Sequence, residues 1–210
     1  MLYEKYRPHS LETFIGQPKA VAVARRIMTH APNGSACVLI TGPSGTGKTT
    51  LARIIARAWA DPSMVREIDG DSCTVEVVRN VANQFRYIPL AGQAVIVNEH
   101  HAMTGKAVQA WLTALEHVPA RTVVVMTSTE EAGDMFGNFS APFLSRFIPI
   151  RFTNQGLADS FALRAQEIAK EAGLDGQPLT RYRRLVQECG NNMRAVLQHI
   201  ESGAMVGGEA

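Results

Sequence analysis

Cysteine is scarce in this sequence of 210 residues, and its placement argues against two kinds of scaffold. The three cysteines, Cys37, Cys73 and Cys189, are widely spaced, odd in number and form no CxxC pair. A disulfide framework and a zinc module both need closely spaced or paired cysteines. Cys37 lies in an apolar run, which indicates a core residue.

Long hydrophobic runs are also missing. The sequence has no run of about 18 apolar residues, so we expect no membrane span and no membrane partner. The segment Met1–Pro8 is charged and aromatic and lacks the apolar stretch of a signal peptide. With the scattered cysteines, these features predict a cytoplasmic protein.

Excess charge of either sign is absent as well. The formal net charge is +2, from 21 Lys and Arg against 19 Asp and Glu. Bulk charge therefore does not predict nucleic-acid binding, and any DNA contact must come from a local patch. Hydrophobic residues make up 46% of the chain, enough for one well-packed domain and a small second one.

Short apolar runs alternate with amphipathic segments over the first three quarters of the chain. Five runs are typical of buried parallel strands: residues 36–41, 65–69, 94–97, 122–126 and 147–152. Helical periodicity occurs between them, at residues 20–29, 50–59, 74–85 and 104–116. This alternation predicts a three-layer α/β fold with a mainly parallel five-stranded sheet. Before it, residues 1–17 predict an extended arm that Pro8 interrupts.

The strand pattern stops after Phe152, and only helical patterns follow. They cover residues 157–172, 179–189 and 192–202, with glycine-containing breaks between them. We therefore predict an α/β domain over residues 1–153 and a small three-helix domain over residues 154–204. The glycine-rich residues 205–210 predict a disordered tail.

A phosphate-binding motif connects the first predicted strand to a helix. Gly42–Thr49 (GPSGTGKT) fits GxxxxGK[ST], in which backbone N–H groups and the positive helix end bind phosphate. Lys48 is expected to reach the β- and γ-phosphates, and the Thr49 hydroxyl to bind Mg²⁺. ATP and Mg²⁺ are thus the predicted cofactors. The residues expected to hold them share this loop and the first turn after it: Gly45, Thr46, Gly47, Lys48, Thr49 and Thr50.

A hydrolytic site of this kind also needs an acidic pair at the end of a neighbouring strand. The candidates follow residues 94–97, where Glu99 is placed to polarise water and Asn98 takes the metal-binding position that usually carries Asp. A neutral amide oxygen predicts weaker magnesium binding and slower turnover without loss of nucleotide binding. We interpret His100 and His101 as polar residues at a strand end, with phosphate or DNA sensing as the alternative.

Four further segments carry a resemblance to a known family. They are Tyr3–Pro8 (YEKYRP), Ile15–Gln17 (IGQ), Asn98–Thr104 (NEHHAMT) and Ser145–Phe147 (SRF). With the phosphate loop, they resemble the AAA+ ATPase subunits of sliding-clamp loaders, most of all the small subunits of replication factor C and their phage counterparts. The resemblance implies that four residues of the N-terminal arm line the adenine pocket: Tyr6, Arg7, Pro8 and Ile15.

The resemblance also implies roles for three polar residues farther along the chain. Ser128, or alternatively Thr127, stands where a sensor residue contacts the γ-phosphate or the water. Arg146 is similar to an arginine finger that acts on ATP in a neighbouring subunit, a contribution of about 10³ to 10⁵ in rate. The alternative for Arg146 is a surface charge or a local salt bridge. Arg194 resembles a second sensor that acts within its own chain.

The sequence departs from the family in several places. Asn98 replaces Asp, and Phe147 replaces Cys. We recognise neither the four-cysteine zinc module of bacterial-type subunits nor the helical collar domain of the family in this sequence. We therefore expect assembly to depend on the ATPase domains, a separate partner or a different ring geometry. The segment Thr129–Pro142 is longer than in the family and is a candidate for shaping a subunit interface.

The resemblance implies an ATP-driven, clamp-loader-like subunit of DNA replication. Its implied partners are copies of itself or other AAA+ subunits through Arg146, DNA, and a sliding clamp. Arg79, Arg86 and Lys106 are candidates for phosphate contacts, with solvated surface charges as the alternative. Two other functions remain: a nucleotide-dependent assembly switch with little hydrolysis, which Asn98 favours, and a DNA remodeller of the helicase-loader or transposition type.

Overall fold

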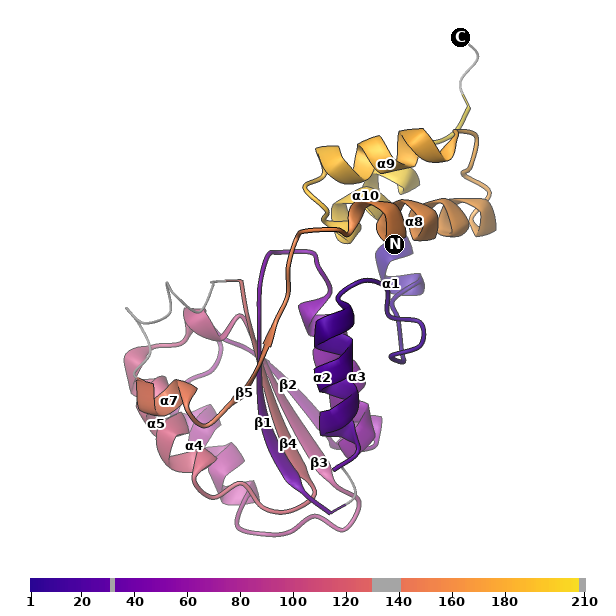
Figure 1. Cartoon of the computed structure of the whole chain (residues 1–210). Coiled ribbons are helices and arrows are strands. Elements are labelled where there is room, and N and C mark those ends of the chain that lie inside the picture. Colours follow the sequence, from indigo (N-terminus) through magenta and orange to yellow (C-terminus); the bar gives the residue numbers. More distant parts are fainter. Residues whose placement is uncertain (31–32, 130–140, 208–210) are drawn as a thin grey trace.

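A five-stranded parallel sheet forms the centre of the larger part of the molecule (Figure 1). The computed structural model describes residues 1–30, 33–129 and 141–207. The strand order is β2-β3-β4-β1-β5, and every neighbouring pair runs parallel. The predicted α/β fold is confirmed. The strands are β1 (Ser35–Thr41), β2 (Val65–Asp69), β3 (Gln93–Asn98), β4 (Thr122–Ser128) and β5 (Ile148–Arg151).

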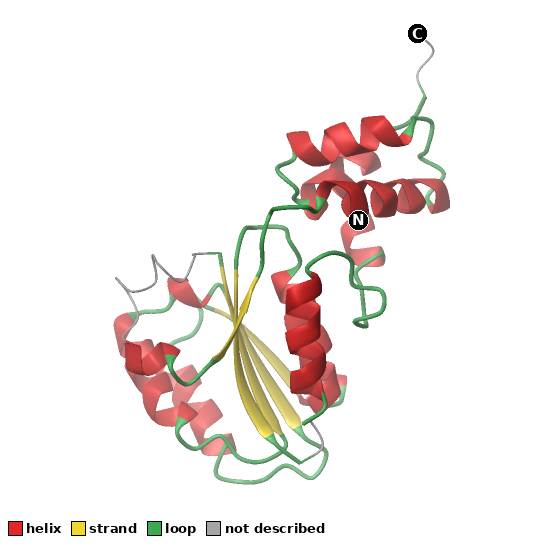
Figure 2. Ribbon diagram, viewed as in Figure 1, coloured by secondary structure: helices red, strands yellow, loops and turns green. Residues whose placement is uncertain are grey.

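Helices cover both faces of the sheet (Figure 2). Two of them, α2 (Pro18–Met28) and α3 (Lys48–Trp59), lie on one face, and α4 (Val75–Gln84) and α5 (Gly105–Leu115) lie on the other. All seven residues of β4 are buried, because that strand has neighbours on both sides and helices above and below. A continuous apolar run is the pattern expected for such a strand.

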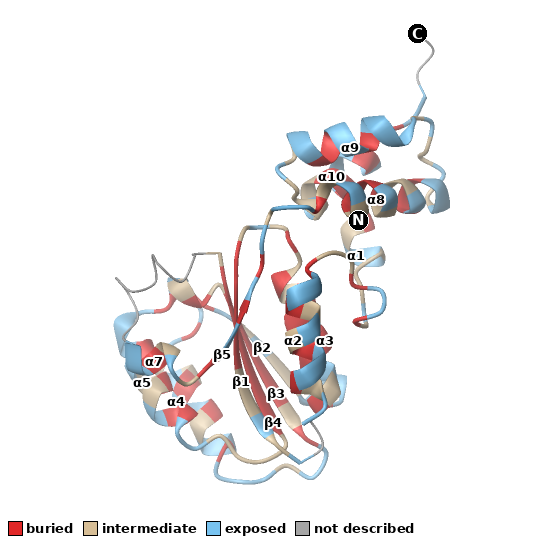
Figure 3. Ribbon diagram, in the orientation of Figure 1, coloured by how far each residue is buried: buried red, intermediate tan, exposed pale blue. Residues whose placement is uncertain are grey.

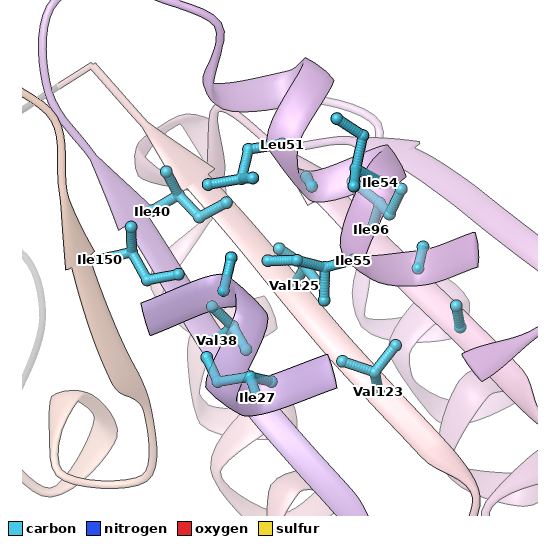
Figure 4. Close-up of a cluster of buried hydrophobic side chains, with 14 of the residues drawn as sticks. Ile27, Val38, Ile40, Leu51, Ile54, Ile55, Ile96, Val123, Val125 and Ile150 are labelled. Atoms are coloured by element: carbon cyan, nitrogen blue, oxygen red, sulfur yellow. The ribbon is translucent and has the colours of Figure 1, made fainter. Parts of the chain in front are cut away.

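The core between the sheet and the helices α2 and α3 is made mainly of branched aliphatic side chains, with alanines and a few aromatic residues (Figure 4). Leu51 and Ile55 of α3 point at β1 and β4, where Ile40 and Val125 are completely buried. On the opposite face, Trp111 of α5 is also fully buried, and its Nε1 donates to Cys73 Sγ at 3.3 Å. These two cores fix the positions of the strand ends, where the polar residues gather.

Three helices form a separate small unit, which we call the lid: α8 (Ala158–Glu171), α9 (Leu179–Glu188) and α10 (Met193–Glu201). The lid has its own apolar cluster, and its outer faces are exposed (Figure 3). Met205 is fully buried in that cluster, so the prediction of a disordered tail from residue 205 is wrong for this residue. Its apolar side chain fills the lid core.

The N-terminal arm (Met1–Gln17) differs from the extended segment that the sequence predicts. Leu2–Lys5 form a helical turn, α1, which packs against α10 of the lid (Figure 1). Leu2 is only 9% exposed and joins the lid cluster, so its burial accounts for the turn. Short helices depend on such tertiary contacts because their own nucleation is unfavourable.

Three short elements complete the described chain: the 3₁₀ turns η1 (Pro62–Met64) and η2 (His100–Ala102), and the helix α7 (Ala141–Leu144). The predicted interface segment, residues 129–142, falls mostly in residues 130–140, which lie outside the described part. Within the described ranges, we find no helix with the length and apolar character needed to cross a bilayer.

Candidate nucleotide-binding site

A single pocket collects residues from the arm, the phosphate loop, the end of β3 and the lid. It contains most of the residues that the sequence analysis assigned to the nucleotide. These are Tyr6, Arg7, Pro8 and Ile15 from the arm, Gly45, Thr46, Gly47, Lys48, Thr49 and Thr50 from the loop and helix α3, and Glu99 and Arg194. Sequence analysis missed further lining residues, among them Tyr3, Phe14, Phe161, Arg164 and Met193.

The phosphate loop has the backbone geometry that its glycines predict. Gly45 and Gly47 have φ angles of +72° and +104°, in the left-handed region that disfavours other residues. The ring of Phe14 lies against Gly47, where an added Cβ would come within 3.0 Å of it. Helix α3 starts directly after Gly47, so its free N–H groups and positive end face the pocket.

Lys48 is held inside the loop. Its Nζ donates to the carbonyl oxygens of Gly42, at 2.8 Å, and Pro43, at 2.9 Å. Burial lowers the pKa of Lys48, the charge of Arg194 acts in the same direction, and the carboxylate of Glu99 opposes both. Lys48 is 5% exposed, and an ammonium group beside the start of a helix is suited to binding phosphate oxygens.

Several contacts fasten the arm to the α/β unit, among them those of Arg7 and Gln17. Arg7 donates from Nη1 to Thr50 Oγ1 at 3.3 Å and also pairs with Glu4. Gln17 is 3% exposed and exchanges two hydrogen bonds with Thr153, of 2.7 and 3.1 Å, where the chain leaves the sheet for the lid. These contacts hold the apolar residues of the arm over one end of the pocket.

Glu99 has a backbone conformation that is uncommon for its residue type. It has a φ of +47° directly after β3, and its amide N–H donates to Thr127 Oγ1 at 3.2 Å. Its Oε2 accepts a hydrogen bond from Thr129 Oγ1 at 3.1 Å and lies 3.5 Å from His101 Nδ1. Such backbone strain clusters at functional sites. Glu99 lines the pocket.

Asn98, at the end of β3, is 7% exposed and belongs to a polar network beside the pocket. Its Nδ2 donates to Glu67 Oε1 at 2.6 Å, and Arg53 donates to both oxygens of Glu67 at 2.9 Å. Burial favours a higher pKa for Glu67, but the hydrogen bonds from Arg53 and Asn98 outweigh it and lower that pKa. Sequence analysis missed Glu67 and Arg53.

The polar residues at the end of β4 are fully buried. Thr127 donates to Asn98 Oδ1 at 3.4 Å, and Ser128 Oγ lies 3.0 Å from His101 Nδ1. The ring of His100 stacks on Phe143 at 6.3 Å, and burial lowers the pKa of His100 to about 4. His100 is therefore a neutral core residue at neutral pH, and His101 is the histidine that faces Glu99 and Ser128.

The lid contributes charge and a direct contact with the phosphate loop. Arg194 lies over the ring of Tyr3, 5.7 Å from its centre. Asn192 caps helix α10 by accepting from the amide of Ala195 at 3.2 Å. The amide of Met193, the residue that follows Asn192, donates to Gly45 O at 3.3 Å. The start of α10 and the phosphate loop are thus joined by a backbone hydrogen bond.

Arg146 does not belong to the described residues that line this pocket. It follows α7 and forms an ion pair with Glu116 at the end of α5, and it also donates to Pro142 O. The side chain of Arg146 is 27% exposed.

A different surface collects the three basic residues that were predicted to contact DNA. Arg79, Arg86 and Lys106 line one groove between α4 and α5, together with His117. The described residues that line this groove include no Asp or Glu. The clustering creates a local positive surface on a chain whose overall charge is nearly balanced.

Comparison with known proteins places the chain in a family. Residues 38–154 match AAA, the ATPase family associated with various cellular activities. The chain belongs to this family. An uncharacterized AAA domain-containing protein of Mycobacterium tuberculosis is 30% identical over 175 residues, which are 81% of this chain and 37% of that protein. The replication factor C small subunit of Thermofilum pendens is 28% identical over 185 residues, 81% of this chain and 53% of the relative.

The chain spans only part of the AAA proteins that it matches. A third relative, the replication factor C small subunit of Methanoculleus marisnigri, is 36% identical over 128 residues, 57% of this chain and 38% of that subunit. Among solved structures, a point variant of RuvB from Thermotoga maritima has a TM-score of 0.72 at 18% identity, covering 93% of this chain and 64% of RuvB. That similarity confirms the fold of an AAA ATPase.

Proposed function

We propose that this chain binds ATP with Mg²⁺ in the pocket between the arm, the phosphate loop and the lid, and hydrolyses it as a clamp-loader-like subunit that works in an oligomer on DNA. The observation that carries the proposal is the convergence of Lys48, Glu99 and Arg194 on one pocket at the start of α3. Membership of the AAA family and the similarity to replication factor C small subunits support it.

In this proposal each polar residue has one role. Lys48 and the amides of the loop bind the β- and γ-phosphates, and Arg194 contacts the γ-phosphate from the lid. Glu99 accepts a proton from the attacking water, and Ser128, or alternatively Thr127, orients that water. The neighbouring donors are oxygen atoms, which suit Mg²⁺. Thr49 and Asn98 would hold the ion, which neutralises charge on the phosphates when bound.

Arg146 acts on the pocket of a neighbouring chain. Its exclusion from the lining of its own pocket and its partly exposed position support this role. The ion pair with Glu116 keeps the guanidinium near the surface until a second chain offers a phosphate. Mixing two inactive variants tests the idea, because Arg146→Ala chains keep Glu99 and Glu99→Gln chains keep the arginine. The mixture regains turnover if the arginine acts between chains, and a mixture as inactive as its parts contradicts the role.

DNA binds through the groove between α4 and α5. Three basic side chains without an acidic neighbour in the lining favour contacts with phosphates, which carry no sequence information. Replacing Arg79, Arg86 and Lys106 with Ala should weaken binding to all DNA sequences and reduce the salt dependence by about one unit of slope per residue. Lys170→Ala, on the exposed surface of α8, is the control. Unchanged salt dependence in the triple variant contradicts the assignment.

An apolar loop supports a protein partner such as a sliding clamp. Tyr87, Ile88 and Leu90 are 76%, 65% and 93% exposed in the segment between α4 and β3. That segment leads into the start of β3, so it lies at the opposite end of the sheet from the phosphate loop. Clustered apolar residues of this size are typical of interaction sites. Loss of clamp binding in Leu90→Ser is the expected result, and full binding by that variant contradicts it.

Turnover of ATP with Mg²⁺, measured with and without primed-template DNA, tests the proposed function. We expect DNA to stimulate turnover and Glu99→Gln to abolish it. Asn98 predicts a slow rate, because a neutral amide binds magnesium less strongly than a carboxylate. Nucleotide binding without turnover in either condition would contradict the hydrolytic role and favour the assembly switch instead.

A further inference from the structure

The amide of Asn98 has a fixed orientation. Its Nδ2 donates to Glu67 Oε1 at 2.6 Å, while its Oδ1 accepts from Thr127 Oγ1 at 3.4 Å. If the amide were flipped, its carbonyl oxygen would meet the carboxylate of Glu67, and two acceptors would face each other without a proton between them. Glu67 therefore fixes the orientation of the amide, with the NH₂ group toward Glu67 and the oxygen toward Thr127.

The sheet order shows where the two ends point. Glu67 belongs to β2, on one side of β3, and Thr127 belongs to β4, on the other. The strand beyond β4 is β1, which leads into the phosphate loop. Thr127 Oγ1 also accepts from the amide of Glu99, which lines the nucleotide pocket, so the oxygen of Asn98 shares its hydroxyl partner with a residue of that pocket.

Glu67 is itself held by the helix that begins at the phosphate loop. Arg53 of α3 donates from Nε to one carboxylate oxygen and from Nη2 to the other, both at 2.9 Å. A paired contact of this kind fixes direction as well as distance. Lys48 and Thr49 lie on the first turn of the same helix. Arg53 and Glu67 consequently tie the orientation of Asn98 to the element that carries the phosphate-binding residues.

We propose that Glu67, held by Arg53, is a positioning residue that presents the carbonyl oxygen of Asn98 to the magnesium ion of bound ATP. The inference rests on the proposed function, because it assumes a magnesium nucleotide in this pocket. This hydrogen-bonded arrangement allows a neutral Asn to take a position usually held by Asp, as long as an acceptor binds its NH₂ group. It also makes the position specific for Asn, since an aspartate at residue 98 would set two carboxylates against each other at 2.6 Å.

The test is a cycle of isosteric variants: Glu67→Gln, Asn98→Asp and the double change. The readout is the dissociation constant of a fluorescent ATP analogue in EDTA divided by that in excess Mg²⁺, because this ratio isolates the contribution of the metal. We expect Glu67→Gln to reduce this ratio by about 10-fold, the usual loss when the partner of a metal ligand is removed. The introduced NH₂ group must face either Arg53 Nε or the NH₂ group of Asn98, so one of the two contacts that fix the orientation becomes a pair of donors. Affinity in EDTA should stay unchanged.

Asn98→Asp alone should lower the ratio as well, although it restores the usual residue. In the double variant, the glutamine amide at residue 67 can donate to the new carboxylate of residue 98 and still accept from Arg53, so the ratio should return to the value of the unaltered chain or exceed it. Glu188→Gln is the matched control, since Glu188 pairs with Arg184 on α9, away from the pocket. If Glu67→Gln does not fold, the comparison of Asn98→Asp with the double variant decides by itself.

Two results overturn the inference alone: an unaltered ratio in Glu67→Gln, or a ratio in Asn98→Asp equal to that in the double variant. Both presuppose that the unaltered chain binds ATP. If the unaltered chain binds no ATP in either Mg²⁺ or EDTA, the proposed function fails and the inference fails with it. Unfolding midpoints, measured without nucleotide, separate a positioning role from a structural one. A positioning role predicts that the ratio falls without a matching fall in the midpoint, whereas a structural role predicts that both fall together.

Discussion

Replacing Gly45 with Ala should damage the contact between the phosphate loop and the lid. Gly45 has a φ of +72°, and a Cβ at this position would come within 1.9 Å of Asn192 Oδ1 and 2.0 Å of its Cγ. Asn192 caps helix α10, and the neighbouring amide of Met193 donates to Gly45 O. A methyl group therefore forces either the side chain of Asn192 or the whole start of α10 to move.

Two separate effects lower the free energy of unfolding of the Gly45→Ala variant. A non-glycine residue in the left-handed region costs about 1 to 2 kcal/mol. Displacing Asn192 removes the cap of α10, which costs about 1 kcal/mol more. We expect Gly45→Ala to lower the free energy of unfolding by about 2 to 3 kcal/mol.

Urea unfolding of the nucleotide-free chain measures this loss, with Gly173→Ala as the matched control. Gly173 has a φ of +70°, and apart from the glycine and its two chain neighbours no described residue would come within 4 Å of a Cβ there. The control carries the backbone cost alone, about 1 to 2 kcal/mol. Equal losses in the two variants would refute the contact between Gly45 and Asn192.

Three smaller predictions concern the cores and the cysteines. Ile55→Ala, at a fully buried position, should lower the free energy of unfolding by about 2 to 5 kcal/mol, whereas Leu163→Ala, 51% exposed, should change it by less than about 0.5 kcal/mol; similar losses in urea would contradict the packing of α3. Tyr182→Phe should lower the free energy of unfolding by about 1 kcal/mol, because the Tyr182 hydroxyl donates to Asp175 at 2.8 Å. An unchanged urea midpoint would contradict a stabilising role for that hydrogen bond. Burial raises the pKa of Cys37 to about 11 from an ordinary value of 9.0, so at pH 8 iodoacetamide should modify it about 100-fold more slowly than in the urea-unfolded chain. Peptide mass mapping after alkylation checks this, and equal rates would contradict it.

The sheet, its helices and the phosphate loop could be predicted from sequence because their signals are local. Apolar runs such as the one leading into Gly42 and the spacing of Lys48 within the motif need no knowledge of distant residues. The network behind Asn98 had no such signal. Glu67 and Arg53 are single charged residues in a strand and a helix, and only the folded sheet brings them to Asn98.

The arm and the tail were harder to predict, for a related reason. Leu2 and Met205 lie at opposite ends of the chain, yet both are buried in the lid cluster. Neither segment has a periodic pattern of its own, so its structure depends on packing against helices far away in the sequence. The same long-range packing brings Tyr3 and Arg164 to the nucleotide pocket.

Binding of ATP with Mg²⁺ to the unaltered chain and to Lys48→Ala tests the central claim most directly. Isothermal titration should show one site per chain. The affinity should fall by about 10- to 100-fold in Lys48→Ala, the range expected for the loss of one hydrogen bond to a charged group. Lys170→Ala, exposed on α8, should bind as the unaltered chain does. Equal affinities in the unaltered chain and in Lys48→Ala would contradict the assignment of this pocket to ATP.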